Sequence, residues 1–142
     1  MNDAAYACHI CTSLEQALPE NTVIRTANWC VTGVKDSPGH LMVTAVTHDA
    51  GIAGLSPEAA ADLGPLIQKL SAGLLASGAF TRTSFIHLGD AAPHTHFMLI
   101  GRAPGDLPVV DAKPLGARVV ALQDAERART EIAELRTLLT LG

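Results

Sequence analysis

The stretch SFIHLGDAAPHTHFMLIGR at residues 84–102 joins an apolar run to two histidines that lie one residue apart. Successive side chains of a strand point to opposite faces, so a strand over 95–101 places His94, His96 and Met98 along one face. Two imidazoles and a thioether then share one surface. A single histidine on a strand is most often a structural residue, but further histidines and cysteines elsewhere in this chain favour a shared site.

Length and composition limit the possible classes of protein. The chain has 142 residues, which is enough for one domain, over residues 1–142, with a sizeable core. Hydrophobic residues make up 48% and aromatic residues only 4%, so the core must be aliphatic. The formal net charge of −4 argues against broad nucleic-acid binding through phosphate neutralisation. With no recognisable export signal or membrane span, we expect a cytoplasmic protein without a disulfide framework.

The pattern of the chain predicts an α+β fold built on five antiparallel strands, or slightly more. Five runs are rich in β-branched and apolar residues, namely 22–27, 28–34, 41–46, 81–88 and 95–101. The short connection at 89–93 favours an antiparallel pair formed by the two strands that flank it. Residues 116–122 are a further candidate strand.

Two main helices are expected. Ser56 as N-cap and Pro57 at the first helical position begin a helix over 56–78. Pro65 is a misfit, and it requires either a kink or a restart of the helix near Asp62. A second helix over 124–140 has an apolar stripe, and its charged residues, Glu131 and Arg136 among them, are assigned to the solvated face.

A cysteine pair near the N-terminus raises the question of a metal site. Cys8 and Cys11 form a C-x-x-C motif, and thiolate with imidazole is a ligand set that Zn²⁺ prefers. His9 lies between them and would point away from their common centre. His48 ends a strand and His94 begins one, so a four-ligand site would tie the N-terminal segment to the sheet. Spacing alone leaves open the alternative of reduced, buried cysteines with unrelated histidines.

The order of these motifs resembles that of the histidine-triad superfamily. Residues 38–43 read PGHLMV, His48 and a helix follow, and HTHFM at 94–98 precedes Arg102. The resemblance covers about 6–102 and leaves a C-terminal extension. It implies a five-stranded antiparallel sheet with packed helices, and an enzyme that transfers or hydrolyses nucleotides at the α-phosphate. It also implies a homodimer, with the first long helix at or near the interface.

The resemblance also implies a ligand set for zinc. In the zinc-bearing branches, the galactose-1-phosphate uridylyltransferases among them, the metal is held by the C-x-x-C pair, by the histidine matching His48, and by the first histidine of the triad. The ligands implied here are therefore Cys8, Cys11, His48 and His94. Four such ligands leave no open coordination position, so the implied zinc is structural.

The nucleophile of the superfamily is the middle histidine, which matches His96. An imidazole nitrogen can attack phosphorus and form a phosphoramidate-type intermediate. The attacking nitrogen must be unprotonated and the other held by a hydrogen bond, which a backbone carbonyl supplies in the superfamily. His40 matches a histidine close to the catalytic group. The alternative for His40 is a turn histidine packed under the sheet.

Several positions depart from the pattern of the superfamily. Met98 replaces a histidine or glutamine, and a thioether cannot donate a hydrogen bond. The loop at 89–94 is short and lacks the usual phosphate-binding donors. His87 stands in place of a common asparagine, and Thr32 stands where an acidic or amide residue often binds the ribose. We expect Thr32, His87, Met98 and Arg102 to be the ligand-binding residues.

Two interpretations of function remain open. The first is a divergent nucleotidyl hydrolase or transferase that uses His96 and acts weakly on ordinary substrates. The alternative is a non-catalytic, zinc-stabilised module that binds a nucleotide, another small ligand or a partner protein. The altered positions favour the module, whereas the retained His96 favours the enzyme.

Overall fold

A five-stranded antiparallel sheet forms the centre of the computed structural model, which describes residues 8–49, 51–89, 92–106 and 113–141. The strand order is β1-β2-β3-β5-β4. The strands are β1 (Thr22–Arg25), β2 (Trp29–Gly33), β3 (His40–Ala45), β4 (Arg82–Ile86) and β5 (His96–Arg102). The helices are α1 (His9–Glu15), α2 (Pro57–Ala76), α3 (Lys113–Ala121) and α4 (Ala125–Leu141), with short 3-10 turns at Pro19–Asn21 and Ile52–Gly54. The predicted α+β fold is confirmed.

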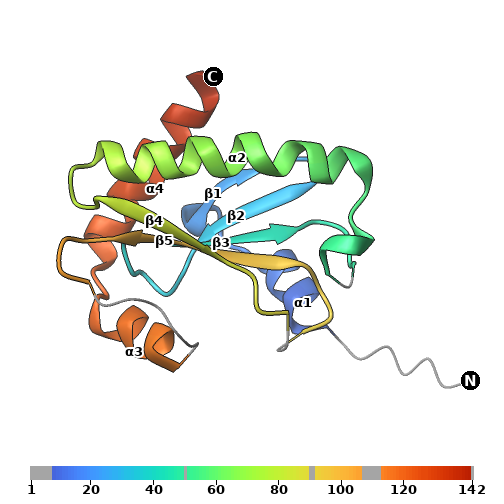
Figure 1. Ribbon diagram of the computed structural model, residues 1–142, viewed down its shortest axis with the longest axis horizontal. Helices are drawn as coiled ribbons and strands as arrows, with labels where there is room; N and C mark the ends of the chain where they lie inside the picture. The colour runs from blue at the N-terminus through green and yellow to red at the C-terminus, as the bar shows by residue number, and fades with distance from the viewer. Residues whose placement is uncertain (1–7, 50, 90–91, 107–112, 142) are drawn as a thin grey trace, which may run out of the picture.

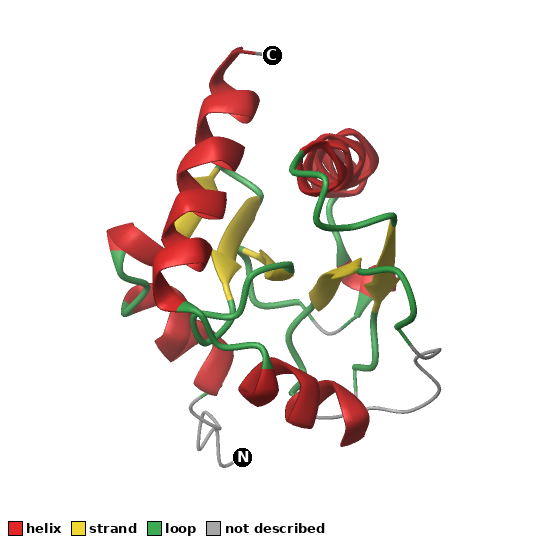
Figure 2. Cartoon of the chain, turned by 90° about the vertical axis from the view of Figure 1, so that its left-hand side faces the viewer, coloured by secondary structure: helices red, strands yellow, loops and turns green. Residues whose placement is uncertain are grey.

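The hydrophobic core lies between the sheet, α2 and α4 (Figure 1). Alternate strand residues supply it, as the period of a half-buried strand requires, and they meet buried side chains of both helices. These residues include Trp29, Val31, Leu41, Val43, Phe97, Leu99, Leu70, Leu74, Ile132 and Leu135. Figure 2 shows α2 end-on and α4 beside it. Helices α1 and α3 lie below the sheet in the view of Figure 1, so the other alternate positions face these shorter helices.

The first long helix is a single element that runs through Pro65. It covers Pro57–Ala76, and the side chain of Ser56 accepts a hydrogen bond from the backbone N–H of Ala59 at 3.1 Å. Leu70 and Leu74, four residues apart on one face of the helix, are buried, whereas Leu75 is 38% exposed. The helix therefore begins at the start signal of Ser56 and Pro57, and Pro65 does not interrupt it.

Residues 116–122, our candidate sixth strand, belong mostly to helix α3 instead. The segment contains two alanines, one arginine and one leucine, which have higher helix propensity than its two adjacent valines. Arg118 anchors the helix, because its Nη2 donates to the carbonyl of Gly101 at 3.2 Å and lies 2.7 Å from the Asp106 carboxylate. Helix α3 thus covers one end of the sheet rather than extending it.

Two charged residues of α4 bind backbone groups instead of facing solvent. Both carboxylate oxygens of Glu131 accept from the backbone N–H of Gly39, at 2.8 and 2.9 Å. The Nε of Arg136 donates to the carbonyl of Thr22 at 2.7 Å. Burial raises the pKa of the Glu131 carboxyl, and the Gly39 hydrogen bond opposes that shift. The sequence-based assignment of these two residues to the solvated face was wrong.

We expect Glu131→Ala to lower the free energy of unfolding by about 1.5 to 3 kcal/mol, because it leaves a backbone donor without its charged acceptor. Glu131→Gln retains an acceptor and should lose less. The exposed Glu134 on the same helix offers a matched control, and Glu134→Ala should stay within about 0.5 kcal/mol of the native protein. Urea unfolding followed by circular dichroism measures all three. Equal losses for the two alanine variants would contradict the role given to Glu131.

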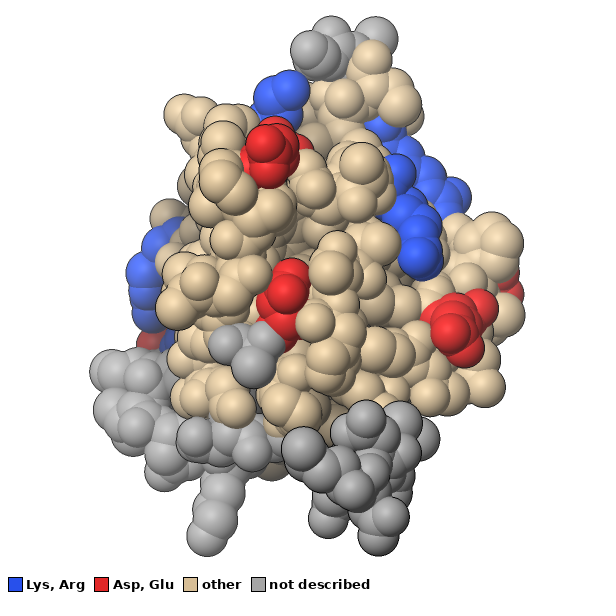
Figure 3. Space-filling view, turned by 90° about the vertical axis from the view of Figure 1, so that its right-hand side faces the viewer, with Lys and Arg blue, Asp and Glu red and all other residues tan. Residues whose placement is uncertain are grey.

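The surface carries no dominant charge on the face shown in Figure 3. Small groups of basic and acidic side chains are separated there by uncharged atoms. Among the described residues, no helix is both long enough and apolar enough to cross a membrane.

Candidate functional site

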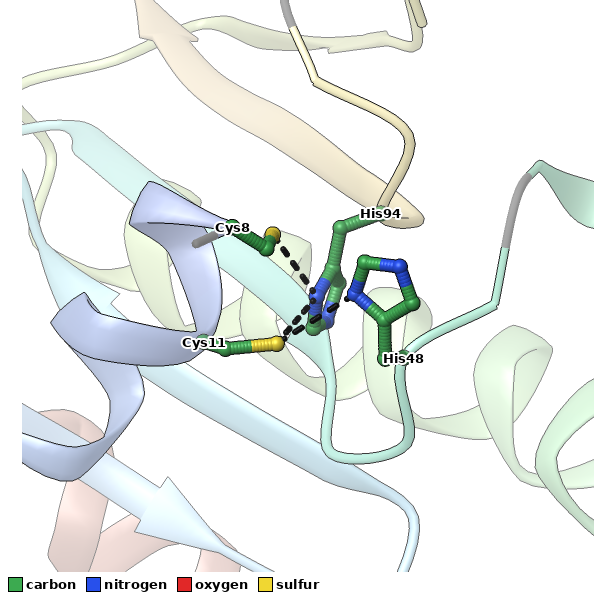
Figure 4. Close-up of side chains that lie close together, drawn as sticks. All are labelled: Cys8, Cys11, His48 and His94. Atoms are coloured by element: carbon green, nitrogen blue, oxygen red, sulfur yellow. Dashed lines mark hydrogen bonds between the residues drawn. The ribbon is translucent and has the colours of Figure 1, made fainter. Parts of the chain in front are cut away.

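The four predicted metal ligands come together beside α1. Cys8 is the N-cap of this helix and Cys11 lies in its first turn, while His48 follows β3 and His94 precedes β5. One ligand atom from each residue lies within 4.8 Å of all the others. Figure 4 shows both sulfurs directed toward the two imidazole rings. The cluster therefore joins the N-terminal helix to two separate loops of the sheet.

The distances within the cluster fit zinc. The Sγ of Cys8 lies 3.6 Å from Nδ1 of His94, and the Sγ of Cys11 lies 3.3 Å from Nδ1 of His48 and 3.4 Å from Nδ1 of His94. Sulfur and nitrogen ligands of one tetrahedral Zn²⁺ lie about 3.6 Å apart, given the usual bond lengths. Two thiolates and two imidazoles also match the chemistry of structural zinc sites. The donor set thus suits this metal without rearrangement of the backbone.

The ring of His94 is oriented by a hydrogen bond to the sheet. Its Nε2–H donates to the carbonyl of Ala45 at 2.7 Å, and the residue is 1% exposed. In a neutral ring with Nε2 protonated, Nδ1 carries the lone pair, and it is this atom that faces the cysteines. Hydrogen bonds of this kind fix the ring orientation of metal-binding histidines. The local structure therefore prepares Nδ1 of His94 as a ligand.

The backbone of His94 also holds the ring of His96. The Nδ1–H of His96 donates to the carbonyl of His94 at 2.7 Å. A carbonyl can only accept, so Nε2 of the neutral His96 ring is unprotonated and available for attack or for a ligand. His87 adds a further restraint, since its Nδ1–H donates to the His96 carbonyl at 2.9 Å. The metal cluster and His96 are thus connected through one residue.

His96 opens onto a cleft between α1 and the sheet. The cleft has a volume of about 320 Å³, which is within the range of small-molecule sites. One wall is a face of the N-terminal segment, formed by His9, Ile10, Ser13, Leu14 and Ala17. The other wall comes from the sheet and the turn after β2, namely Thr32, Gly33, Val34, Lys35, Met42, Thr44 and His96.

Four polar residues that line this cleft were not predicted from the sequence to contact a ligand, namely His9, Ser13, Lys35 and Thr44. Spacing of i, i+4 along a helix places His9 and Ser13 on one face, and this signal could have indicated their role. Thr44 could have been found from strand pairing, because it lies opposite His96 in the β3–β5 ladder. Nothing in the local sequence distinguishes Lys35, which belongs to a turn. His9 is absent from the metal cluster, as we expected, and it faces the cleft instead.

Three of the four predicted ligand-binding residues lie outside the described lining of the cleft. Thr32 lines it. Met98 lies on the same face as His96, opposite Met42, but next to the lining rather than in it. The ring of His87 lies on the opposite face of the sheet, with its centroid 4.9 Å from that of Phe97. His87 therefore supports the backbone of His96 and does not meet a ligand in this cleft.

Arg102 lies at the far end of β5 from His96. Its side chain is buried, with Nε 3.6 Å from the Asp106 carboxylate. The same carboxylate contacts Arg118 of α3, and the hydrogen bond from Arg118 holds the pKa of Asp106 below its usual value. The structure thus places Arg102 in the packing of α3 against the sheet and not in the cleft.

His40 is fully buried in the turn that begins β3. Its Nδ1 lies 2.9 Å from the Ser37 hydroxyl and 3.2 Å from the carbonyl of Pro38. His40 pairs with Ile100 whereas His96 pairs with Thr44, so the two histidines lie about 13 Å apart along the ladder. This position corresponds to our alternative of a turn histidine packed under the sheet. We therefore remove His40 from the candidate active site.

The burial of His40 predicts a pH-dependent stability. Burial lowers the pKa of the His40 imidazole, and the nearby Arg118 acts in the same direction. The unfolded chain then binds a proton more readily than the folded one, so unfolding becomes easier as pH falls below about 6.5. We expect the loss of stability as pH falls below about 6.5 to be smaller in His40→Asn than in the native protein. Urea titrations with zinc held saturating measure this difference, and parallel curves for the two proteins would contradict it.

Comparison with solved structures identifies the fold. A Zn-bound histidine-triad family protein from Mycobacterium smegmatis has a TM-score of 0.72 at 16% identity, covering 98% of this chain and 100% of that one. A hypothetical histidine-triad nucleotide-binding protein from Sulfolobus tokodaii has a TM-score of 0.68 at 20% identity, covering 94% and 93%. The diadenosine triphosphate hydrolase of Plasmodium falciparum has a TM-score of 0.63 at 15% identity, covering 87% and 79%.

These similarities show that the chain has the histidine-triad fold, which confirms the resemblance seen in the sequence. The sequence matches no protein-family model and no curated protein. The identities are low, so the likeness to these structures concerns the fold.

Proposed function

We propose that the protein is a histidine-triad hydrolase or transferase that acts at the α-phosphate of a nucleotide through His96. The observation that carries the proposal is the hydrogen bond of 2.7 Å from Nδ1 of His96 to the His94 carbonyl. It leaves Nε2 as the nucleophilic nitrogen of a residue that lines a ligand-sized cleft. The named activities of similar structures, nucleotide binding in one and diadenosine triphosphate hydrolysis in another, support the same class of reaction.

The chemistry needs two displacements at phosphorus. In the first, the Nε2 lone pair forms a bond to the α-phosphorus while the bond to the leaving group breaks, and that group departs with the bonding pair and takes a proton from solvent. The ring keeps its Nδ1 proton, and the His94 carbonyl stabilises the positive charge on the ring. In the second, water or an acceptor hydroxyl attacks phosphorus and releases a proton. The phosphorus–nitrogen bond breaks, and the neutral imidazole returns.

Few residues around His96 can donate a hydrogen bond to the negative charge that develops on the phosphate oxygens and the leaving group during the reaction. Met98 lies at the next position on the same face and cannot donate, while Met42 lies opposite it. Thr44 is the nearest hydroxyl by strand pairing, since it lies opposite His96. Slow turnover of ordinary substrates is therefore part of the proposal. The alternative, a binding module without turnover, is supported by the same lack of donors.

We further propose that Cys8, Cys11, His48 and His94 hold a structural zinc ion. Zinc with four protein ligands stabilises the fold and has no open position for a substrate. Here it would fix α1, which is one wall of the cleft, and His94, whose carbonyl binds His96. None of the proposed reaction steps passes through the metal.

Intact-mass measurement tests the proposed reaction. The zinc-loaded protein is mixed with a nucleoside phosphoramidate or a dinucleoside polyphosphate, quenched rapidly, and searched for an added nucleotidyl mass. We expect this adduct in the native protein and in His9→Ala, a matched control that removes another histidine of the same cleft. His96→Ala should show none. Nucleotide binding without an adduct in the native protein would favour the binding module.

The exposed edge of the sheet supports a homodimer. Helix α4 covers the β1 edge through Arg136, but β4 lies at the other edge, and Phe85 and Leu88 are 41% and 55% exposed there. Leu75 of α2, on the same side, is also exposed. Open edges with apolar side chains favour pairing with a second copy.

We expect light scattering to report a dimer at tens of micromolar. Phe85→Lys places a charge on the open edge and should shift the population to monomer, whereas Ile52→Lys, at an exposed apolar residue in the 3-10 turn before α2, should not. A monomeric native protein at this concentration would contradict the proposed dimer.

A further inference from the structure

We propose that Lys35 binds a second anionic group of the ligand, so that the preferred ligand is a nucleotide with a phosphate on its ribose as well as its 5′-phosphate. This inference rests on the proposed function and names the substrate class of the same cleft. It depends on three features, namely the position of Lys35 on the same wall of the cleft as His96 but two strands away, the charge of the cleft, and the backbone that presents the lysine.

Lys35 and His96 both belong to the sheet-side wall of the cleft, at different places along it. His96 belongs to β5, and Lys35 follows β2, with β3 between the two strands. Two strand spacings correspond to about 10 Å across the sheet, and Lys35 also lies about 16 Å further along the strands, five residues beyond Cys30, which shares the level of Thr44 and His96. Lys35 nevertheless belongs to the lining of the same cleft. A ligand whose 5′-phosphate meets His96 therefore extends across the face of β3, past Met42, toward the β2 side. The part of a nucleotide beyond its 5′-phosphate is the ribose and the base, and a charged group on the ribose can approach Lys35.

The charge of the cleft favours an anion at that side. Lys35 carries a full charge, and the described lining residues include no Asp or Glu. The other polar side chains of the lining are the hydroxyls of Ser13, Thr32 and Thr44 and the imidazoles of His9 and His96. Without a competing carboxylate, the lysine is free to pair with a ligand, and a phosphate dianion gains more from this pairing than a ribose hydroxyl does.

The backbone at Lys35 adopts a conformation that lysine rarely takes. Lys35 and Asp36 have φ values of 46° and 55°, and Ser37 N–H donates to the carbonyl of Val34 at 2.9 Å. Two successive positive φ values closed by this hydrogen bond form a type I′ turn, in which asparagine and glycine are the usual residues. Non-glycine residues in this region of backbone space are strained, and such strain is concentrated at functional sites.

The segment before α4 holds this turn from outside. The side-chain amide of Gln123 donates to the carbonyl of Lys35 at 3.1 Å, and the backbone N–H of Asp124 donates to the carbonyl of Asp36 at 2.8 Å. Both carbonyls of the strained pair therefore have fixed partners. The turn is thus a rigid support that directs a lysine, in place of the expected glycine or asparagine, into the lining of the cleft.

Calorimetric titration of the zinc-loaded protein with two related nucleotides tests this inference. The probes are adenosine 5′-monophosphate and adenosine 3′,5′-bisphosphate, with the 2′,5′-bisphosphate as a third compound that locates the second phosphate. None carries a leaving group on its 5′-phosphate, so binding is measured without turnover. We expect one of the bisphosphates to bind at least about fivefold more tightly than the monophosphate, as one added ion pair allows. The advantage should shrink as salt concentration rises.

Three variants test whether Lys35 causes the tighter binding of the bisphosphate relative to the monophosphate. Lys35→Gly removes the cation and also relieves the positive φ, so it should unfold at the same or a higher temperature than the native protein while losing the bisphosphate advantage. Lys35→Arg should keep the advantage. Lys69→Gln, on α2 and therefore on the opposite face of the sheet, is a control for charge removal and should also keep it.

The outcomes separate this inference from the proposed function. Equal affinities of the native protein for the monophosphate and both bisphosphates would overturn the role of Lys35 while leaving the role of His96 intact. A bisphosphate advantage that persists in Lys35→Gly would also overturn it. Failure of every nucleotide to bind the native protein would overturn the proposed function together with this inference.

Discussion

His96→Ala should abolish hydrolysis of nucleoside phosphoramidates and dinucleoside polyphosphates, to the level of the uncatalysed reaction. The expected loss is large because this change removes the nucleophile itself, and the described cleft offers no second imidazole held in the same way by a backbone carbonyl. The native activity should be weak, so the measurement needs a fluorogenic substrate and high enzyme concentration. Initial rates with saturating substrate give the comparison.

Changes at Met98 should act in the opposite direction. Met98→His or Met98→Gln adds a donor two residues from His96 on the same face of β5. One well-placed hydrogen-bond donor to the charge that develops in the transition state contributes on the order of 10²- to 10³-fold in rate. We therefore expect the rate of hydrolysis to increase by up to about 10²-fold. Met98→Leu, which adds no donor, is the matched control and should leave the rate unchanged. Activity that survives in His96→Ala would exclude the histidine-triad reaction and leave only the fold.

Loss of zinc should destabilise the protein more than any single packing change. We expect one Zn²⁺ per chain by metal analysis, and Cys11→Ser should remove it, because Cys11 contacts both histidines of the cluster. Metal binding in such a site contributes directly to folding free energy, so the unfolding temperature should fall sharply. Helix α1 has only seven residues, too few for stability on its own, and it depends on this connection to the sheet.

Two controls separate metal loss from loss of a thiol. Cys30 is fully buried outside the cluster, so Cys30→Ala should cost packing energy and still retain one equivalent of zinc. Chelation of the native protein should reproduce the Cys11→Ser phenotype. Zinc below a tenth of an equivalent in protein prepared without chelators would contradict the structural metal site.

Local signals in the sequence were sufficient for most elements of the fold. The five strands were predicted from β-branched residues and alternation, and α2 from the Ser56 and Pro57 start signal. These signals depend on backbone preferences and on a period of two or 3.6 residues, which are present in the chain before it folds. The resemblance in the order of the motifs likewise predicted the cluster of Cys8, Cys11, His48 and His94. This was possible because the C-x-x-C motif and the positions of the two histidines next to strands can be recognised in the sequence.

Contacts between distant segments were decided by the tertiary structure. Glu131 belongs by pattern to a solvated helix face, yet it binds the backbone of Gly39. Arg102 follows the histidine motif closely, but the strand carries it to the opposite end of the sheet from His96. Lys35 gave no local signal and lines the cleft because Gln123 and the residue after it hold its turn. Such roles depend on which backbone donors, carboxylates and ring nitrogens come into contact after folding. Local periodicity and secondary-structure propensity do not predict contacts between segments that are distant in the sequence.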